Sequence, residues 1–509
     1  MKTILLILFG ALLGIALLPY LLVRQPKMPE GTNLESAPFL FERAELLIDH
    51  TRYDEVAGEY LLEHQIFDRI LKEVREAETF IIADFFLWNP WKGGIEGGGE
   101  LRALSGRLAD ALISKRIQNP NMPILVITDP INRIYGDLAP EFFDRLASYE
   151  IPVVFTDLNQ LPDSNRIYAP QARFWGKFFG SEEKEESNRL LPNPFDVTGE
   201  KLTLGQFGRL LFFKANHRKV LVTGHRRANP RLIIGSLNPA DGSANHSNLA
   251  LYVEGAVASF AGSSELEIAK WSAQDAANIH EGLGLEASKA IRAIEQVLSP
   301  MAASTLALEG QSSITYVSEG AIHATILAQL EGAQAGAQID LGLFYFSDRK
   351  VVQALKEAIK RGVELRLLLD ANRDAFGREK NGIPNRIVAA ELMELINEGT
   401  VEVRWAATNG EQFHSKVMRI RGLRQDSLLL GSANWTRRNL ANLNLEANVV
   451  VRNAASIGAR FDSYFETLWT NGDGYFESLP YSDWAESGWS LRWKSWLYRF
   501  QEWSGASTF

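Results

Sequence analysis

The 509-residue sequence contains no cysteine. Disulfide bonds, zinc sites with cysteine ligands, iron–sulfur clusters and a thiol nucleophile are therefore excluded. Histidine and carboxylate residues do not recur at the spacing of metal ligands either, so the sequence indicates no metal ion and no other cofactor.

Positive charge is in the minority. The chain has 53 Lys and Arg against 62 Asp and Glu, a formal net charge of -9. Proteins that bind nucleic acid through its phosphates usually carry the opposite balance, which argues against nucleic acid as a partner. The 46% apolar share is typical of a folded globular protein, and the length predicts roughly two to four domains.

One long apolar run stands at the amino terminus. Between Lys2 and Arg24 the sequence TILLILFGALLGIALLPYLLV carries no charge. As a helix rising about 1.5 Å per residue, it would span about 30 Å, the thickness of a bilayer core. We predict a single membrane anchor over residues 1–24, a linker over residues 25–40, and a body on the extracytoplasmic (periplasmic) side. A cleavable signal peptide is the alternative, although its apolar stretch would be shorter and end in small residues.

The rest of the chain alternates apolar runs with amphipathic segments, and it does so twice. In the first half HQIFDRILKEVREAE precedes TFIIADFFLW and MPILVITDPIN; in the second, IHATILAQLEGAQAG precedes QIDLGLFYFSD and VELRLLLDANRD. Short apolar strands between helices predict an α/β protein with helices outside the sheets. We predict two tandem units, residues 41–285 and 286–475. Residues 160–210 have no counterpart in the second unit and are interpreted as an insertion.

A short motif occurs once near the end of each unit. FFKANHRKVLVT is followed by LIIGSLNPA, and EQFHSKVMRI is followed by LLLGSANWT. Each copy is His-x-Lys, an apolar strand, a polar turn, a second apolar strand, and Gly-Ser-x-Asn. Side chains two apart in a strand point to the same face, and a hairpin would return Gly-Ser-x-Asn to them. The candidate residues are His217, Lys219, Ser236, Asn238, His414, Lys416, Ser432 and Asn434.

These residue types suit a tetrahedral anion. Two lysines would neutralise a phosphate, and Asn and Ser side chains would donate hydrogen bonds to its oxygens. Two imidazoles can divide nucleophilic and acid–base catalysis. Residues 201–240 contain eight Lys and Arg and no Asp or Glu, and we interpret this segment as a focused positive surface for phosphate. A solvated basic hairpin is the alternative.

The repeated motif resembles the paired HKD motif of the phospholipase D superfamily, and the likeness covers most of residues 40–475. The run GSANWTRRNLANLNLEANVVV, with Arg438, Asn444 and Glu446, is the more specific copy. The resemblance implies two tandem α/β/α sandwich units in one bilobal body, with one active site at the seam. It also implies metal-independent phosphoryl transfer through a phosphohistidine.

The resemblance further implies a role for each residue. His217 would be the nucleophile, His414 the general acid and then base, and Glu446 the carboxylate that orients an imidazole. The phosphate ligands would be Lys219, Lys416, Asn238 and Asn434. Further substrate contacts are expected from Ser236, Ser432 and Asn248.

The sequence departs from the family pattern in two respects. The aspartate expected five positions after each lysine is replaced by Gly224 and Arg421. The position equivalent to Glu446 in the first unit is Asn248. The second departure is closer to the chemistry, because an amide can orient an imidazole but cannot stabilise its positive charge.

The last segment, residues 476–509, is predicted to form a Trp-rich amphipathic helix. Its aromatic residues Trp489, Trp493, Trp496, Phe500 and Trp503 fall at intervals of 4, 3, 4 and 3, which places them in one stripe. The stripe either packs on the body or lies in the headgroup layer of a membrane.

Together these features predict a membrane-anchored enzyme acting on a phosphodiester bond of a phospholipid. It would be a phospholipase D-like hydrolase or a phosphatidyltransferase of the cardiolipin-synthase kind, depending on whether water or an alcohol attacks the intermediate. An exported nuclease is an alternative, favoured by residues 201–240 and opposed by the net charge. A catalytically inactive lipid-binding protein is a third possibility, supported by Gly224, Arg421 and Asn248.

Overall fold

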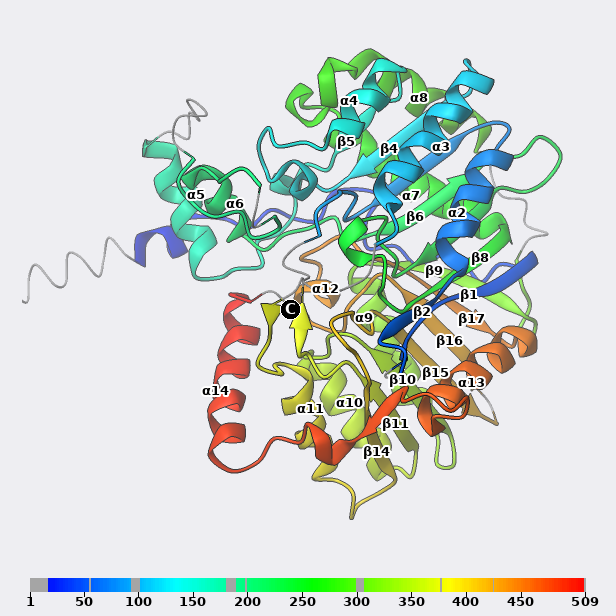
Figure 1. Cartoon of the computed structure of the whole chain (residues 1–509), viewed down its shortest axis with the longest axis vertical. Coiled ribbons are helices and arrows are strands. Elements are labelled where there is room, and N and C mark those ends of the chain that lie inside the picture. Colours follow the sequence, from blue (N-terminus) through cyan, green and yellow to red (C-terminus); the bar gives the residue numbers. More distant parts are fainter. Residues whose placement is uncertain are drawn as a thin grey trace, which may run out of the picture.

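The protein is a mixed α/β structure with two eight-stranded sheets (Figure 1). The computed structural model describes residues 17–54, 56–92, 101–179, 189–196, 199–298, 306–375, 378–423 and 425–507. Most of the anchor predicted over residues 1–24 lies outside these ranges. Within them, no helix is long and apolar enough to cross a membrane.

The first sheet has the strand order β2-β1-β8-β7-β6-β3-β4-β5. Strands β3, β4 and β5 are parallel, while β3 and β6 and the remaining neighbours pair antiparallel. Both β3 and β4 are buried along their whole length, which explains their continuous apolar sequences. The bounds of the strands are β1 Phe41–Asp54, β2 Glu59–His64, β3 Ile81–Phe85, β4 Ile124–Thr128, β5 Val153–Phe155, β6 Lys219–Thr223, β7 Arg231–Gly235 and β8 Asn248–Gly255.

The second sheet repeats this arrangement. Its order β9-β17-β16-β15-β10-β11-β14 corresponds strand by strand to β1-β8-β7-β6-β3-β4-β5, with β18 added at the end. The parallel and antiparallel pairs also correspond. The internal duplication expected from the sequence is therefore confirmed. The bounds are β9 Ser313–Ser318, β10 Gln338–Leu343, β11 Glu364–Leu369, β14 Val401–Ala406, β15 Lys416–Gly422, β16 Gln425–Gly431, β17 Ala447–Arg452 and β18 Ser478–Pro480.

Helices cover the outer face of each sheet. On the first unit the amphipathic sequence of α2 buries Ile66, Phe67, Ile70 and Val74 against the sheet. The outer helices of the first unit are α2 Gln65–Glu76, α3 Leu104–Gln118 and α4 Glu141–Ser148. Those of the second are α9 Gly320–Gly332, α10 Arg349–Lys360, α11 Asn385–Met393 and α14 Gly488–Ser504.

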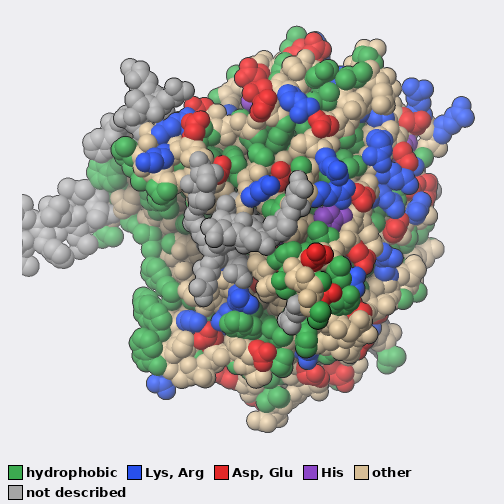
Figure 2. Space-filling view, in the orientation of Figure 1, with side chains coloured by type: hydrophobic (Ala, Val, Ile, Leu, Met, Phe, Trp, Pro, Cys, Tyr) green, Lys and Arg blue, Asp and Glu red, His purple; other side chains and the backbone are tan. Residues whose placement is uncertain are grey.

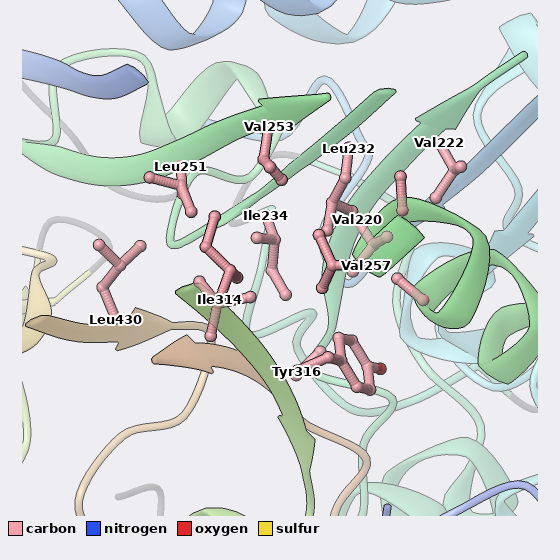
Figure 3. Close-up of a cluster of buried hydrophobic side chains, with 14 of the residues drawn as sticks. Val220, Val222, Leu232, Ile234, Leu251, Val253, Val257, Ile314, Tyr316 and Leu430 are labelled. Atoms are coloured by element: carbon pink, nitrogen blue, oxygen red, sulfur yellow. The ribbon is translucent and has the colours of Figure 1, made fainter. Parts of the chain in front are cut away.

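The two units share one hydrophobic core (Figure 3). Strands β6, β7 and β8 contribute Val220, Ile234 and Leu251, and they meet Ile314 of β9 and Leu430 of β16 across the seam. The same core takes in the inner helices α7 Ala256–Ser272, α8 Gly284–Val297 and α13 Ala455–Thr470. The contacts of α8 are with α7 and β4, so this helix packs on the first sheet.

Residues 25–40, expected as a linker, are ordered along the second unit. The amides of Ser36 and Phe39 donate to the carbonyls of Tyr316 and Ile314, each at 2.9 Å. The predicted insertion forms α5 Tyr168–Phe179 and α6 Leu204–Leu210, which lie to one side of the body in Figure 1. On α5, Tyr168, Phe174 and Trp175 are partly buried, and the Trp175 indole donates to Gln171 at 3.1 Å.

The expected C-terminal helix is present as α14. Its Leu491, Leu497 and Tyr498 pack on the core of the second unit. The five stripe aromatics lie on the opposite side and are exposed.

Candidate active site

Each His-x-Lys segment is held by the other unit. The amide of His217 donates to the carbonyl of Leu445 at 2.9 Å, and the amide of His414 donates to the carbonyl of Ser247 at 2.9 Å. Leu445 and Ser247 immediately precede Glu446 and Asn248, the two imidazole partners, where β17 and β8 begin. The two motifs are thereby brought to the same seam, related by the pseudo-twofold symmetry of the duplicated units.

The Gly-Ser-x-Asn segments begin where β7 and β16 end. A Cβ atom on Gly235 would lie 2.4 Å from the carbonyl oxygen of Leu249, and one on Gly431 would lie 2.4 Å from that of Ala447. Only glycine lets the neighbouring strand approach this closely. The serine after each glycine is thereby placed beside the first residues of that strand.

The histidines take their partners from the opposite units. Nδ1 of His217 lies 2.9 and 3.1 Å from the two carboxylate oxygens of Glu446. Nδ1 of His414 lies 3.0 Å from Oδ1 of Asn248. The Nδ2 atom of Asn248 donates to the carbonyl of His246, so its oxygen faces His414 and accepts the Nδ1 proton. Each ring is left with Nε2 for chemistry.

Ser236, Ser432 and Asn248 are engaged behind the histidines. Ser236 donates to Asn248 at 3.0 Å, and Ser432 donates to Glu446. Like Lys219 and Lys416, none of the three is among the residues that line the cavity described below. These hydrogen bonds position the imidazole partners, and the substrate contacts expected of the three residues stay a prediction.

Two aspartates that the sequence analysis did not assign also hold the site. Asp129 accepts the amide of Asn216 at 2.7 Å, and Asp370 accepts the amide of Phe413 at 3.0 Å. These amides precede the two histidines by one residue. The signal was present in the sequence, since both aspartates directly follow equivalent strands in the repeated ILVITD and LRLLLD segments.

His246 is a third histidine of the site, also missed. Its Nδ1 accepts the amide of Gln412 at 3.2 Å, so the neutral ring carries its proton on Nε2. Burial lowers the pKa of His246 to about 3. Among the described residues, Nε2 has no hydrogen-bond partner, and the ring lies 5.9 Å from that of His414. The equivalent residue of the second unit is Asn444, which accepts the amide of Ala215 at 3.0 Å.

The two motif lysines, Lys219 and Lys416, are almost completely buried. Each Nζ donates to the carbonyl of its own motif histidine at 2.6 Å and lies over an aromatic ring, Phe86 for Lys219 and Phe344 for Lys416. Burial lowers the pKa of Lys219 to about 7. Burial and the nearby Lys219 lower the pKa of Lys416 as well. An anion bound here would restore the charged form of both lysines.

The histidines are electrostatically unequal. Burial lowers the pKa of His217 to about 4, although Glu446 acts in the opposite direction. Burial and Lys416 hold the pKa of His414 well below its usual range, and the partner of its Nδ1 is the uncharged Asn248. Burial opposes ionisation of Glu446, yet His217 and Lys219 hold its pKa below the usual range. Glu446 therefore stays ionised beside His217.

A cavity of about 410 Å³ joins these residues at the seam. Its polar lining comes from both units and includes His217, Asn238, His246, His414, Asn434 and Arg438. Its apolar lining comes largely from the end of the insertion and the residues after it: Pro194, Phe195, Phe207, Leu210, Leu211 and Phe213. An apolar pocket with a few convergent polar groups is typical of a small-molecule site.

The two departures from the family's aspartate lie far from the lysines. Gly224 and Arg421 stand near the ends of β6 and β15 that are remote from the lysines, and Arg421 binds Asp462 at 2.6 Å. The interpretation of residues 201–240 as one positive surface is wrong. Lys214 binds Asp163, Arg231 binds Glu73 and Glu76, and only part of the segment lines the cavity.

Arg218, also in that segment, is completely buried between the units. Its guanidinium lies 2.6 Å from Glu319 of the second unit and 3.1 Å from Glu265 of the first. The same Glu319 oxygen accepts the amide of Glu446 at 3.1 Å. Arg218 thus ties the backbone beside His217 to the segment that carries its carboxylate partner.

We expect Arg218→Met to lower the free energy of unfolding by about 3–5 kcal/mol, because it leaves buried carboxylates without their cation. Urea denaturation would measure the change. The control Arg227→Met removes an exposed arginine from the β6–β7 turn and should alter stability by no more than about 0.5 kcal/mol. Equal stability of Arg218→Met and the parent protein would contradict the role given to this ion pair.

Part of the second unit matches a known protein family. Residues 326–469 match the family model described as cardiolipin synthase, PLD-like domain. No curated protein matches the chain. Phosphatidylserine synthase from Haemophilus influenzae Rd KW20 has a similar structure, with a TM-score of 0.55 and 11% identity over 92% of this chain and 96% of that chain.

Two other solved structures are more distant. Polyphosphate kinase from Porphyromonas gingivalis has a TM-score of 0.45 at 11% identity, over 96% of this chain and 57% of that chain. Nuc, a phospholipase D family member from Salmonella typhimurium, has a TM-score of 0.26 at 19% identity, over 31% of this chain and 95% of that chain. Residues 326–469 thus match a PLD-like domain, and the His-x-Lys and Gly-Ser-x-Asn motif of that region recurs in the first unit.

Proposed function

We propose that the protein is a membrane-anchored phospholipase D-like enzyme that cleaves or transfers the phosphodiester of a phospholipid through a phosphohistidine. The observation that carries this proposal is the single cavity lined by both motif histidines, with their Nδ1 atoms already engaged. The uncharged run before Arg24 supports the anchor.

The roles follow from the contacts. Nε2 of His217 attacks phosphorus, and the bond to the headgroup oxygen breaks. The ring then carries positive charge, which the adjacent Glu446 carboxylate stabilises. The phosphate oxygens accept hydrogen bonds from Lys219, Lys416 and the amides of Asn238 and Asn434.

His414 acts as the general acid and then as the general base. Burial and the nearby lysines lower the pKa of His414. Phosphate bound between the lysines offsets their charge, which favours the imidazolium that protonates the leaving alkoxide. The neutral ring then takes a proton from water or an alcohol as that oxygen attacks phosphorus and the N–P bond breaks. His246 Nε2–H adds a fixed hydrogen-bond donor on the same side.

The apolar lining supports a lipid substrate. Side chains such as Phe195, Phe207 and Leu210 offer no hydrogen bonds to a sugar or base, whereas they suit glycerol-linked acyl chains. The transferase alternative, of the cardiolipin-synthase kind, is favoured by the matched family model. A nuclease and an inactive lipid-binding protein are the remaining alternatives.

An assay with labelled phosphatidylglycerol distinguishes these functions. We expect the protein to release phosphatidic acid in EDTA, and to form phosphatidylethanol when ethanol is present. Single-stranded DNA, tested separately, should stay intact. His217→Ala protein purified in the same way controls for contaminating enzymes. Cleavage of DNA but not lipid would favour the nuclease, complete metal-reversible loss in EDTA would contradict the mechanism, and no turnover of either substrate would favour the inactive protein.

A further inference from the structure

Helix α14 presents a ladder of aromatic rings to solvent. The aromatic stripe consists of Trp489, Trp493, Trp496, Phe500 and Trp503, which are between 38% and 78% exposed. The three middle rings stack, with centroids 5.3 Å apart for Trp493 and Trp496 and 5.8 Å apart for Trp496 and Phe500. A contiguous exposed patch of this kind marks an interaction surface.

The opposite side of α14 fixes the stripe in place. The Tyr498 hydroxyl donates to the carbonyl of Ser347 at 2.6 Å, and the Ser347 hydroxyl donates to Glu502 at 2.7 Å. At the end of the helix, the amide of Arg166 donates to the carbonyl of Ser504 at 2.7 Å. The exposure of the aromatic rings is therefore a feature of the folded protein and not of a loose terminus.

The apolar surface continues beyond α14. Arg166 belongs to the insertion, where the neighbouring Ile167 carbonyl accepts the hydroxyl of Tyr20 at 2.9 Å. Residues 17–22 are helical and mostly exposed there, and Leu204 of α6 is 70% exposed. In Figure 1, α14, α6 and the N-terminal helix lie on one side of the molecule. In Figure 2, hydrophobic side chains form the edge of the molecule at α14.

The charges on α14 are of one sign where solvent reaches them. Arg492 and Arg499 are exposed, whereas Glu502, the one acidic residue of the helix, is buried. Tryptophan favours the membrane interface, and arginine there meets the phosphates of anionic lipids. The chemistry of the helix is thus complementary to an anionic bilayer surface.

We propose that the aromatic stripe, together with α6 and residues 17–22, docks on the surface of an anionic phospholipid bilayer. The chain before Leu17 continues as an uncharged apolar sequence back to Thr3, and it leads to this surface. Phe207 of α6 is 37% exposed and also lines the catalytic cavity. Docking would therefore bring the cavity close to lipid headgroups. This inference rests on the proposed function for its substrate, but not for the binding itself.

The test compares the full-length protein with the variant Trp489→Ser/Trp493→Ser/Trp496→Ser/Trp503→Ser. The first readout is hydrogen exchange of residues 488–504 in nanodiscs of phosphatidylglycerol or phosphatidylcholine. The second is turnover of phosphatidylglycerol vesicles and of the water-soluble bis(p-nitrophenyl) phosphate. A matched control, Leu285→Ser/Leu423→Ser, removes exposed leucines from α8 and from the β15–β16 turn.

We expect slower exchange in α14 with phosphatidylglycerol than with phosphatidylcholine. We also expect at least about a tenfold loss of vesicle turnover in the α14 variant, with turnover of the soluble diester and of the control unchanged. Equal exchange with and without lipid, or full vesicle turnover by the variant, would overturn docking. Protection that depends on protein concentration without lipid would assign the stripe to a second copy instead. If neither substrate is turned over by the parent protein, the proposed function fails, while exchange still tests the docking.

Discussion

The His217→Ala variant is expected to release no nitrophenol from a nitrophenyl phosphodiester, either as a burst or in the steady state. Without the imidazole no bond to phosphorus can form, and turnover should fall by about a thousandfold or more. His414→Ala should behave differently. Nitrophenolate is a weakly basic leaving group that needs little protonation, so this variant should release one equivalent and then stop.

The stalled His414→Ala protein should carry a phosphoryl group on His217, because no base remains to activate water. Rapid mixing with absorbance detection measures the burst, and peptide mass spectrometry under alkaline conditions locates the adduct. The pairing of Glu446 with His217 supports this order, since only that ring has a carboxylate to stabilise its charge. A burst from His217→Ala with the adduct on His414 would show that the roles are reversed.

Lys219→Ala and Lys416→Ala should each reduce turnover by at least about a hundredfold, through loss of phosphate charge stabilisation in a site shielded from water. The two lysines are close enough to interact, since Lys219 helps to lower the pKa of Lys416. Loss of either should therefore matter, although they come from different units. Steady-state turnover of phosphatidylglycerol measures the effect, and thermal unfolding checks that the variants fold.

The matched control is Lys289→Ala, which removes a lysine from the exposed face of α8 and should leave turnover unchanged. Near-normal turnover by Lys219→Ala or Lys416→Ala would remove the model of one site shared by both units.

The duplication could be predicted because it is written in local sequence. Apolar runs ending in Asp129 and Asp370, and the two His-x-Lys segments, recur in the same order. Strand order and helix faces then follow from periodicity and burial. The crossed pairing of Glu446 with His217 could not be predicted, because it depends on how two distant units meet across the seam.

Charge was the least informative feature of the sequence. The eight cations of residues 201–240 form a dense cluster in sequence, yet Arg218 is buried in ion pairs and Arg231 faces α2. Strand alternation sends neighbouring residues to opposite faces, so Lys219 reaches the site while Arg218 points into the core. A count of charges in a segment does not contain that information.

For the C-terminal helix, residue spacing could predict the secondary structure but not the packing. Spacing alone gave the helix and its aromatic stripe, but it left open whether the stripe packs on the body. The structure assigns that task to Leu491, Leu497 and Tyr498. Which face of the helix is buried depends on where the second unit lies, and the spacing of residues within the helix does not contain that information.

The central claim is that a phospholipid phosphodiester is exchanged through His217. The most direct test mixes wild-type protein with phosphatidylglycerol labelled at phosphorus, in EDTA, and quenches the reaction in alkaline denaturant within the first turnover. We expect a labelled phosphatidyl group on the peptide that contains His217, and its transfer to ethanol when ethanol is added before the quench. Continued turnover with no label on His217, or with label on another residue, would contradict the mechanism.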